Sequence, residues 1–363
     1  MATIKGGQGI KALAVLEEGG SLKPTEIGRP EPGPNDVHIK VLYCGQCHSD
    51  LHATNGEWGI NLYPMTPGHE IAGTVMASNS PNFLVGQNVG VGCMVESCRS
   101  CDLCDEGLEN HCPSMIQTYS ASYPKASGHD DCADYHTNGG YSEEIVVRDR
   151  FVFAIPDALP LEFAGPLLCA GITTYSPLNR LVKGKKDQSV GVVGFGGLGM
   201  MTAKLAIAMG AKVTIISRNL SKAKEAEAIG ANLVSHQDSD VMTGLTRTFN
   251  TIIDTVSVHH NIEAILSSLK VGGNFCFLGG VPQPYEISAF TLLFNRYNIS
   301  GSLIGGVPET KEMLDFCVEH NVFPTIQIIK AQDAAGVFEA MQQGKAGGIR
   351  NVIDMSTIGE LFE

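Results

Sequence analysis

The stretch Ser189–Gly199 reads Ser-Val-Gly-Val-Val-Gly-Phe-Gly-Gly-Leu-Gly, and it decides the fold of this chain. Its first part, rich in valine, is typical of a buried strand. The glycines at positions 194, 196 and 199 follow directly in a G-x-G-x-x-G pattern. An apolar helical segment is then expected at Met200–Met209, followed by a second strand at Lys212–Ile216. This order favours a dinucleotide-binding unit over a merely glycine-rich turn.

The residues predicted to hold the dinucleotide lie in this turn and after the second strand. The glycines allow a pyrophosphate to approach the helix N-terminus closely. Where an NAD-preferring site usually carries a carboxylate, this sequence has Ser217-Arg218, with Lys222 beyond. Such groups suit the 2′-phosphate of NADP(H), although a solvated basic patch is the alternative interpretation. The predicted cofactor-binding residues are Gly194, Gly196, Gly197, Leu198, Gly199, Ser217, Arg218 and Lys222.

Strands and helices continue to alternate around the glycine turn, which predicts an α/β fold with a doubly wound parallel sheet. A helix is expected at Leu220–Ile229 with Asn219 as its N-cap, and another near Ile262–Leu269. Residues 1–157 are predicted to be mostly β, for example at Val37–Tyr43. The tail, residues 302–363, is predicted to return to that first domain. Residues 158–301 would then form the dinucleotide-binding domain.

Composition and charge exclude several classes of protein. The chain has 363 residues, 43% of them hydrophobic and 17% charged, as in a globular protein. Its formal net charge of −13 argues against nucleic acids and anionic membrane surfaces as partners. No apolar run reaches membrane-spanning length and no signal peptide is recognisable, so we expect a cytoplasmic protein. Eleven cysteines without a secretory signal favour metal binding over disulfides.

One cysteine group has the spacing of a metal-binding loop. Four cysteines follow C-x2-C-x2-C-x7-C at Cys98, Cys101, Cys104 and Cys112. Four thiolates on a short loop can close a tetrahedron around Zn²⁺, which indicates a structural site. An iron–sulfur cluster uses the same donors and is the competing interpretation, and four free thiols clustered by chance is the remaining one.

A second group of potential ligands is spread over three segments. The stretch Cys44–His52 supplies a thiol at Cys47, and Gly68-His69-Glu70 and Leu168-Cys169-Ala170 supply the other donors. Three N and S ligands with one open position are typical of a catalytic zinc. Taken alone, Cys44–His52 would be weak evidence, because a buried cysteine beside polar loop residues is common.

With these motifs assembled, the chain resembles the zinc-dependent medium-chain alcohol dehydrogenases, and within them the cinnamyl alcohol dehydrogenase branch. The resemblance runs from about Lys11 to Asp354. It includes Pro166–Gly171 and Ile253-Asp254-Thr255 besides the stretches above. It implies a GroES-like β domain enclosing a Rossmann domain, two zinc ions per chain, NADP(H) and a homodimer.

The resemblance also implies roles for individual residues. Cys47, His69 and Cys169 would bind the catalytic zinc, with Glu70 beside the metal and able to approach it. Asp50 would orient His69, and Ser49 and His52 would relay protons to solvent. The segment Gly347–Asn351 lacks the usual tyrosine-arginine arrangement, which puts one cofactor contact in doubt.

The implied reaction is the reversible reduction of a small aldehyde to a primary alcohol by NADPH. Two alternatives stay open. The same scaffold could reduce a C=C or C=N bond, or the chain could be a dinucleotide-binding structural protein without turnover.

Overall fold

The structure is a computed structural model that describes residues 9–59, 62–122, 136–218, 220–343 and 349–363. The chain forms two compact units. The first comprises Met1–Cys169, Gly306–Val318 and Pro324–Glu363, and the second comprises Ala170–Gly305 and Glu319–Phe323. The units change 12 and 4 residues after the domain boundaries expected at 157/158 and 301/302, and Glu319–Phe323 belong to the second unit. The expected boundaries stay a prediction.

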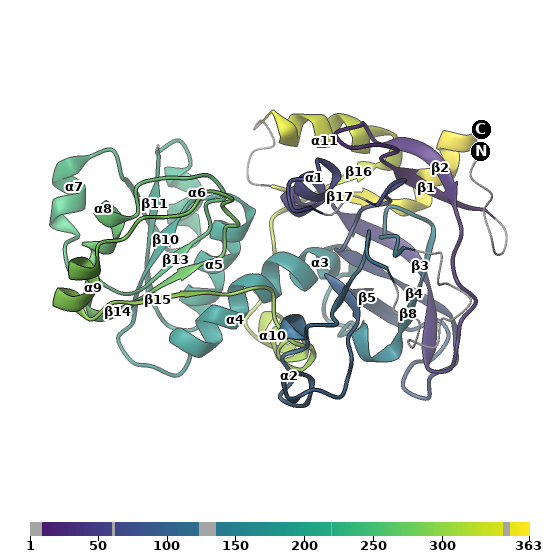
Figure 1. The fold of residues 1–363 in the computed structure, drawn as a ribbon, viewed down its shortest axis with the longest axis horizontal. Helices are drawn as coiled ribbons and strands as arrows, with labels where there is room; N and C mark the ends of the chain where they lie inside the picture. The colour runs from purple at the N-terminus through teal and green to yellow at the C-terminus, as the bar shows by residue number, and fades with distance from the viewer. Residues whose placement is uncertain (1–8, 60–61, 123–135, 219, 344–348) are drawn as a thin grey trace. The chain divides into compact units, whose positions relative to one another are not determined.

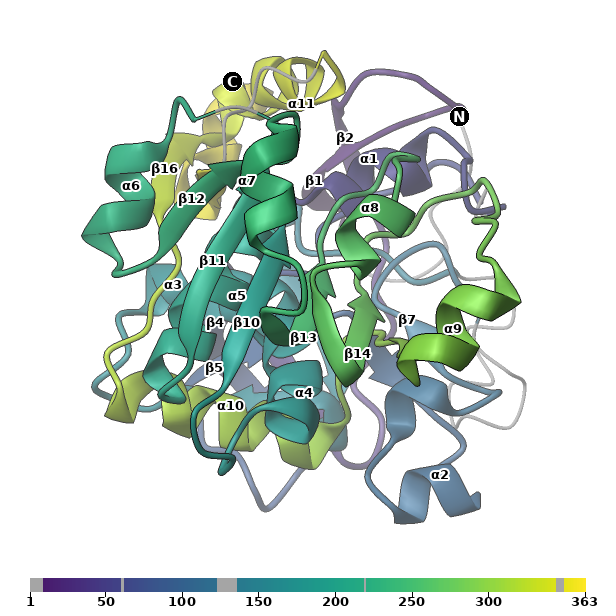
Figure 2. The same cartoon turned by 90° about the vertical axis from the view of Figure 1, so that its left-hand side faces the viewer.

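The second unit is built on a parallel sheet with the strand order β12-β11-β10-β13-β14-β15, six strands within the described residues. Figure 2 shows most of these strands side by side. The strand order changes direction between β10 and β13, so the sheet is doubly wound as predicted. The strands are β10 (Ser189–Val193), β11 (Lys212–Ser217), β12 (Asn232–Ser235), β13 (Phe249–Asp254), β14 (Leu269–Phe277) and β15 (Asn298–Gly301).

The helices of this unit differ in three places from the expected ranges. The helix after the glycine turn begins at Gly197, because the turn itself supplies its first residues. The helix expected at Ile262–Leu269 covers only four residues, and Leu269 instead begins β14. Hydroxyls of Ser267 and Ser268 bond to nearby carbonyls at this point and compete with the helix. The helices are α4 (Ile172–Leu181), α5 (Gly197–Ala208), α6 (Ala223–Ala228), α7 (Ser239–Gly244), α8 (Glu263–Leu266) and α9 (Ala289–Asn295).

The helix expected at Leu220–Ile229 corresponds to α6, which begins three residues later with Lys222 as its N-cap residue. The expected N-cap, Asn219, lies outside the described residues. The core of the unit is formed by apolar residues of β13, β14 and α8, including Phe249, Leu266 and Phe275, which are fully buried. This apolar packing holds the carboxyl ends of the central strands in place.

The first unit contains a larger sheet with the order β16-β17-β3-β4-β5-β9. One more strand, β8, also pairs with β3 and lies outside this linear order. The last strand of this sheet, β17, pairs antiparallel with β3. Figure 1 shows these yellow C-terminal strands beside the purple N-terminal ones. The strands are β3 (Asp36–Gly45), β4 (Ile71–Ser78), β5 (Asn88–Val91), β8 (Glu144–Arg148), β9 (Val152–Ala154), β16 (Ile326–Lys330) and β17 (Arg350–Asp354).

Shorter elements complete the first unit. Two-stranded sheets pair β1 (Ile10–Ala14) with β2 (Lys23–Ile27), and β6 (Met94–Glu96) with β7 (Ile116–Gln117). The helices are α1 (His48–Thr54), α2 (Asp102–Asp105), α3 (Leu161–Pro166), α10 (Val307–Glu319) and α11 (Ala334–Gln342), with 3₁₀ turns η1 (Glu109–His111), η3 (Asp149–Phe151), η5 (Ala331–Asp333) and η6 (Met355–Phe362). Across the described ranges, no helix has both the length and the hydropathy that crossing a bilayer requires.

Candidate active site

The first zinc ligand is fixed by the junction of β3 with α1. Cys47 is the N-cap residue of α1, and its backbone N–H donates to Asp50 Oδ2 at 3.0 Å. The Cys47 side chain in turn faces the backbone N–H of Asp50, and this reciprocal capping box stabilises the first turn of a short helix. A Cβ on Gly45 would lie 2.0 Å from a carboxylate oxygen of Glu70, so only glycine fits there. The strand end and the helix start therefore bring Cys47 and Glu70 together.

The second ligand is delivered by a turn that only glycine can form. Gly68 has φ +102°, and a Cβ there would lie 2.6 Å from the ring of Tyr141. The chain then enters β4 immediately after His69 and Glu70, both of which are buried. The turn thereby directs an imidazole and a carboxylate into the interior.

Cys169 lies in a π-helical turn, η4 (Leu167–Gly171), which follows α3. Such turns are rare in proteins as a whole, and those that occur often lie at functional sites. The turn places Cys169 Sγ 3.9 Å from Cys47 Sγ and 3.2 Å from His69 Nε2. Ligand atoms of Cys47, His69, Glu70 and Cys169 all lie within 4.8 Å of one another.

These distances fit one zinc ion. Zinc–sulfur bonds of about 2.3 Å in a tetrahedron put two sulfurs about 3.8 Å apart. The thiol of Cys169 bonds to Cys47 and thereby holds the pKa of Cys47 well below its usual range, against the effect of burial. A ready thiolate is what a metal needs as a ligand. The donor set and its spacing thus suit a zinc with three protein ligands.

Asp50 contacts the ring of His69, which the resemblance implies it would orient. Its Oδ1 accepts from His69 Nδ1 at 3.0 Å and from Gly68 N–H at 3.1 Å, and Oδ2 accepts from Tyr141 Oη at 3.0 Å. Burial lowers the pKa of His69, but the charge and hydrogen bond of Asp50 outweigh it and raise that pKa. With Nδ1 occupied by Asp50, Nε2 is left for a metal. Tyr141 was not predicted, because nothing in its local sequence marks it.

Glu70 is a buried carboxylate next to the ligands. Within the described residues neither of its side-chain oxygens has a hydrogen-bond partner, and Arg350 Nη1 lies 3.5 Å away. Burial raises the pKa of Glu70 to about 7. Arg350 also donates to the Gln46 carbonyl at 2.9 Å. This arginine, from the segment that departs from the family pattern, therefore serves the zinc region of its own unit; residues 347–348 of that segment lie outside the described residues.

The two expected proton-relay residues occupy one helix but are not bonded to each other. Cys47 Sγ and Ser49 Oγ are 3.6 Å apart. His52 Nδ1 instead bonds to Glu57 at 2.6 Å, and its ring stacks on Trp58 with centroids 5.1 Å apart. Among the described residues no hydrogen bond joins Ser49 to His52. Glu57 was missed, because a partially exposed glutamate after a helix is ordinary in sequence.

The four-cysteine loop forms a second compact group of donors. Its sulfurs lie 3.9 Å apart for Cys98 and Cys104, 3.9 Å for Cys101 and Cys112, and 3.5 Å for Cys98 and Cys112. These separations match the edges of a tetrahedron around a single zinc. In an iron–sulfur cluster the thiolates bind different irons and lie farther apart, so the distances favour zinc. The backbone N–H of Ser114 also points at Cys112 Sγ, at 3.4 Å.

The glycine turn after β10 has the shape of a dinucleotide site. Gly194 has φ +92°, and a Cβ on Gly199 would lie 2.2 Å from the Gly194 carbonyl oxygen, so the turn and α5 pack closely. A Cβ on Gly196, the N-cap residue of α5, would meet no protein atom within 4 Å. The missing side chain leaves open space beside the helix N-terminus. A pyrophosphate fits this space, as the expected roles of the three glycines require.

The polar groups expected at the 2′-phosphate lie next to this turn. Ser217 ends β11 and is half-buried, and Arg218 is exposed. Lys222 Nζ donates to the Phe195 carbonyl at 3.3 Å and lies over its ring at 5.9 Å. Lys222 thus reaches back to the glycine turn.

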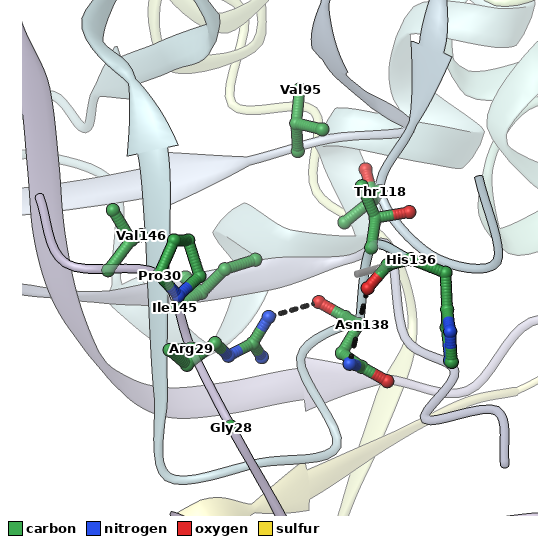
Figure 3. Close-up of a pocket in the computed structure, with 10 residues that line it drawn as sticks. Gly28, Arg29, Pro30, Val95, Thr118, His136, Asn138, Ile145 and Val146 are labelled. Atoms are coloured by element: carbon green, nitrogen blue, oxygen red, sulfur yellow. Dashed lines mark hydrogen bonds between the residues drawn. The ribbon is translucent and has the colours of Figure 1, made fainter. Parts of the chain in front are cut away.

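A small cavity of about 10 Å³ lies elsewhere in the first unit, between Arg29, Val95 and Asn138. Figure 3 shows the Arg29 guanidinium bonded to the Asn138 carbonyl, and it also donates to Gly139 O at 2.8 Å. The space suffices for about one water, and none of the predicted site residues lines it. We therefore assign it no ligand.

Comparison with known proteins identifies the family of each half. Residues 33–157 match the alcohol dehydrogenase GroES-like domain, and residues 197–319 match the zinc-binding dehydrogenase domain. The predicted α/β fold, with a GroES-like domain and a Rossmann-type sheet, is thereby confirmed.

Individual relatives match over most of the chain. Aldehyde reductase YahK of Escherichia coli is 43% identical over 96% of this chain and 99% of its own. Cinnamyl alcohol dehydrogenase 2 of Rauvolfia serpentina is 46% identical over 87% of each chain. The crystal structure of CAD from Helicobacter pylori complexed with NADP(H) is 38% identical, has a TM-score of 0.86, and covers 96% of this chain and 98% of its own.

Proposed function

Because the chain belongs to the zinc-containing medium-chain alcohol dehydrogenases, we propose that it reversibly reduces aldehydes to primary alcohols with NADPH. The observation that carries this proposal is the buried set of Cys47, His69 and Cys169, with Asp50 holding the histidine. Its similarity to an aldehyde reductase and to a cinnamyl alcohol dehydrogenase supports the same reaction.

When bound, zinc supplies polarisation of a carbonyl and the nicotinamide supplies or accepts the hydride. Cys47, His69 and Cys169 hold the metal, and Glu70, whose oxygens have no hydrogen-bond partner among the described residues, stands ready to approach it. Asp50 keeps the proton of His69 on Nδ1, so that Nε2 always faces the metal position. All of these side chains are buried, so the groups beside the reacting oxygen are preorganised and shielded from water.

The proton of the alcohol moves through the hydroxyl of Ser49. This hydroxyl lies 3.6 Å from the sulfur of Cys47, and it can both donate and accept a hydrogen bond. His52 passes the proton on to solvent and is held for that role by Glu57 and Trp58. Water bridges the gap between Ser49 and His52, since no direct bond joins them in the described part of the chain.

The dinucleotide is held by the second unit. Gly194, Gly196, Gly197, Leu198 and Gly199 take the pyrophosphate. Ser217, Arg218 and Lys222 take the 2′-phosphate of NADPH, a choice that the NADP(H) complex of a relative supports. The four-cysteine site, Cys98, Cys101, Cys104 and Cys112, holds the structural zinc.

A panel of aromatic, allylic and aliphatic aldehydes, assayed with NADPH and with NADH, tests the proposal. We expect turnover with NADPH and loss of turnover in Cys47→Ala, whose fold should persist. Full reduction of a C=C bond with the carbonyl left intact would show that the enzyme is a different reductase. Binding of NADPH without turnover of any aldehyde would favour a structural role.

We further propose that the protein is a cytoplasmic homodimer. Strand β15 ends the parallel sheet and pairs only with β14 within the described residues. Helix α9 precedes it and exposes Phe290, Leu293 and Phe294 at 67%, 70% and 77%. An open sheet edge beside an apolar helix is the kind of surface that a second copy covers. Sedimentation of the wild-type protein and of Leu293→Glu tests this, since the variant should be monomeric.

A further inference from the structure

A group of three polar side chains in contact with one another in the second unit has no part in the roles above. It consists of Asp254, His260 and Tyr285. Asp254 ends β13 and is fully buried, although a carboxylate is seldom buried without charged partners. His260 Nε2 lies 3.3 Å from Asp254 Oδ2, and His260 Nδ1 lies 3.1 Å from Tyr285 Oη. At 3.3 Å the first contact is an ion pair, since its alignment is not that of a hydrogen bond.

The acceptors around the ring favour its charged form. His260 Nδ1 lies 2.9 Å from the Val258 carbonyl oxygen, and Nε2 faces the Asp254 carboxylate. The Val258 carbonyl only accepts hydrogen bonds, so it requires a proton on Nδ1, and the buried carboxylate beside Nε2 favours a positive charge on the ring. The close contact with Asp254 accordingly raises the pKa of His260, with burial opposing it.

The neutral ring has a different partner available. With one proton on Nε2, the bare Nδ1 can accept from the Tyr285 hydroxyl, but it then faces the Val258 carbonyl without a proton between them. The other titratable groups nearby do not replace the ion pair. His259 stacks on Tyr285 with centroids 4.9 Å apart, and Glu263 of α8 receives Ser288 N–H at 3.5 Å.

This group is joined to the glycine turn through the loop between Asp254 and His260. Asp254 Oδ1 accepts from Val256 N–H at 3.1 Å, and Thr255 Oγ1 donates to the Val193 carbonyl at 2.7 Å. A Cβ on Gly194 would lie 2.8 Å from Thr255 Oγ1 and 3.0 Å from Val256 Cγ2. The loop therefore packs directly against the turn that takes the pyrophosphate.

The position of Asp254 in the sheet relates this packing to cofactor binding. Val193 at the end of β10 is in register with Asp254 at the end of β13, and Asp254 with Phe277 of β14. The strand order changes direction between β10 and β13, and dinucleotides bind at such a switch point, outside the carboxyl ends of the strands. The residues from Thr255 to His260 thus form one wall of the cofactor site.

We propose that His260, paired with Asp254, is a positioning residue that fixes residues 255–260 in the conformation that binds NADP(H). The inference rests on the proposed function, because it assumes a dinucleotide at the switch point. The imidazolium bonds the Val258 carbonyl on one side and neutralises the buried carboxylate on the other. Loss of that proton releases the loop and weakens cofactor binding.

The test is NADPH binding to the purified protein, measured by fluorescence titration from pH 6 to pH 9. His260→Gln removes the charge but keeps a polar side chain, and we expect its affinity at pH 6.5 to fall roughly tenfold. The wild-type affinity should decline relative to that of His260→Gln as the pH rises through the raised pKa of His260. Comparing the two proteins at each pH cancels the titration of the cofactor phosphate. In kinetics the KM for NADPH should rise while kcat at saturating NADPH is retained.

A histidine–carboxylate pair in the first unit provides a matched control. His38 Nε2 lies 2.7 Å from Glu144 Oε2, on strands that carry no predicted cofactor contact, so His38→Gln should bind NADPH within about twofold of wild type. His260→Lys, which restores a cation, should recover part of the lost affinity. Thermal melting without cofactor checks that each variant is folded.

Two results would overturn the inference. One is wild-type affinity and pH dependence in His260→Gln, and the other is an equal loss in His38→Gln. Both presuppose a wild-type protein that binds NADPH. If the wild-type protein binds neither NADPH nor NADH, it is the proposed function itself that is wrong.

Discussion

Asp50 Oδ1 accepts the ring N–H of His69 at 3.0 Å, and both side chains are almost entirely buried. Asp50→Asn should leave the ring without a charged acceptor and lower zinc affinity about 10- to 100-fold. Competition with a chelator, with zinc counted by elemental analysis, measures this. Tyr141→Phe removes another donor to the same carboxylate and is the matched control, because it leaves the Asp50–His69 bond in place. Equal zinc affinity in Asp50→Asn and wild type would contradict the role of Asp50.

The two zinc sites should have separable effects. Cys98→Ala should lower the melting temperature and the yield of soluble protein, because metal binding is part of the folding free energy of its loop. Cys47→Ala should retain the fold but lose alcohol oxidation. Elemental analysis should count two zinc ions in wild type and one in each variant. One zinc ion or none in carefully prepared wild-type protein would refute the two-site assignment.

Proton transfer should depend more on Ser49 than on His52. Ser49→Ala should lose about 10²–10⁴-fold in rate, the usual contribution of an acid–base group. His52→Ala should lose less, because water can replace a group at the outer end of a relay. Glu57→Gln should resemble His52→Ala, since it removes the carboxylate that holds the ring. Stopped-flow measurement of alcohol oxidation gives these rates, and a wild-type rate in Ser49→Ala would remove that residue from the mechanism.

Cofactor preference should follow the groups after β11. Arg218→Ala and Lys222→Ala should raise the KM for NADPH and leave the KM for NADH nearly unchanged, because only NADPH carries the 2′-phosphate. Lys224→Ala, an exposed lysine one residue into α6, is a suitable control. Equal or higher kcat/KM with NADH in the wild-type enzyme would show that the site prefers NAD.

Stability without cofactor should also depend on pH through His260. Its pKa in the folded protein is raised above 6.5, mainly by the bond to Asp254. The stabilisation is therefore fully present below pH 6.5 and is lost as the pH rises through the raised value. Chemical denaturation at pH 6 and pH 9 should show a larger loss for wild type than for His260→Gln. Identical losses would mean that the ion pair does not contribute to stability.

Much of the fold could be predicted from the sequence, because periodicity and glycine placement report backbone geometry locally. The strand expected at Val37–Tyr43 lies within β3, and the one expected at Lys212–Ile216 lies within β11. Helix ends were less predictable. At α8 the side chains of Ser267 and Ser268 decide where the helix stops, and a pattern of apolar residues does not register that competition.

The site was predictable where ligands share a motif and less so where partners come from distant segments. The spacing of the cysteines alone predicted the four-cysteine site. Tyr141 and Arg350 reach Asp50 and Glu70 from segments far along the chain, so only the tertiary structure reveals them. His260 was missed for another reason. Its partner Asp254 is an ordinary strand-ending residue in the sequence, and only the structure shows that its carboxylate is buried and therefore stabilised by a nearby cation.

The pairing of β17 with β3 has a consequence for synthesis on the ribosome. Gln46 lies next to the first catalytic ligand. Its carbonyl accepts a hydrogen bond from Arg350, 304 residues later in the sequence, and its N–H donates to the Asn351 carbonyl. The loop that carries Cys47 therefore lacks its hydrogen-bond partners on β17 until the ribosome has synthesised that strand. The dinucleotide-binding sheet, whose strands are all translated earlier than β17, can assemble first. The residue next to Cys47 can therefore form its final backbone hydrogen bonds only after translation has passed Asn351.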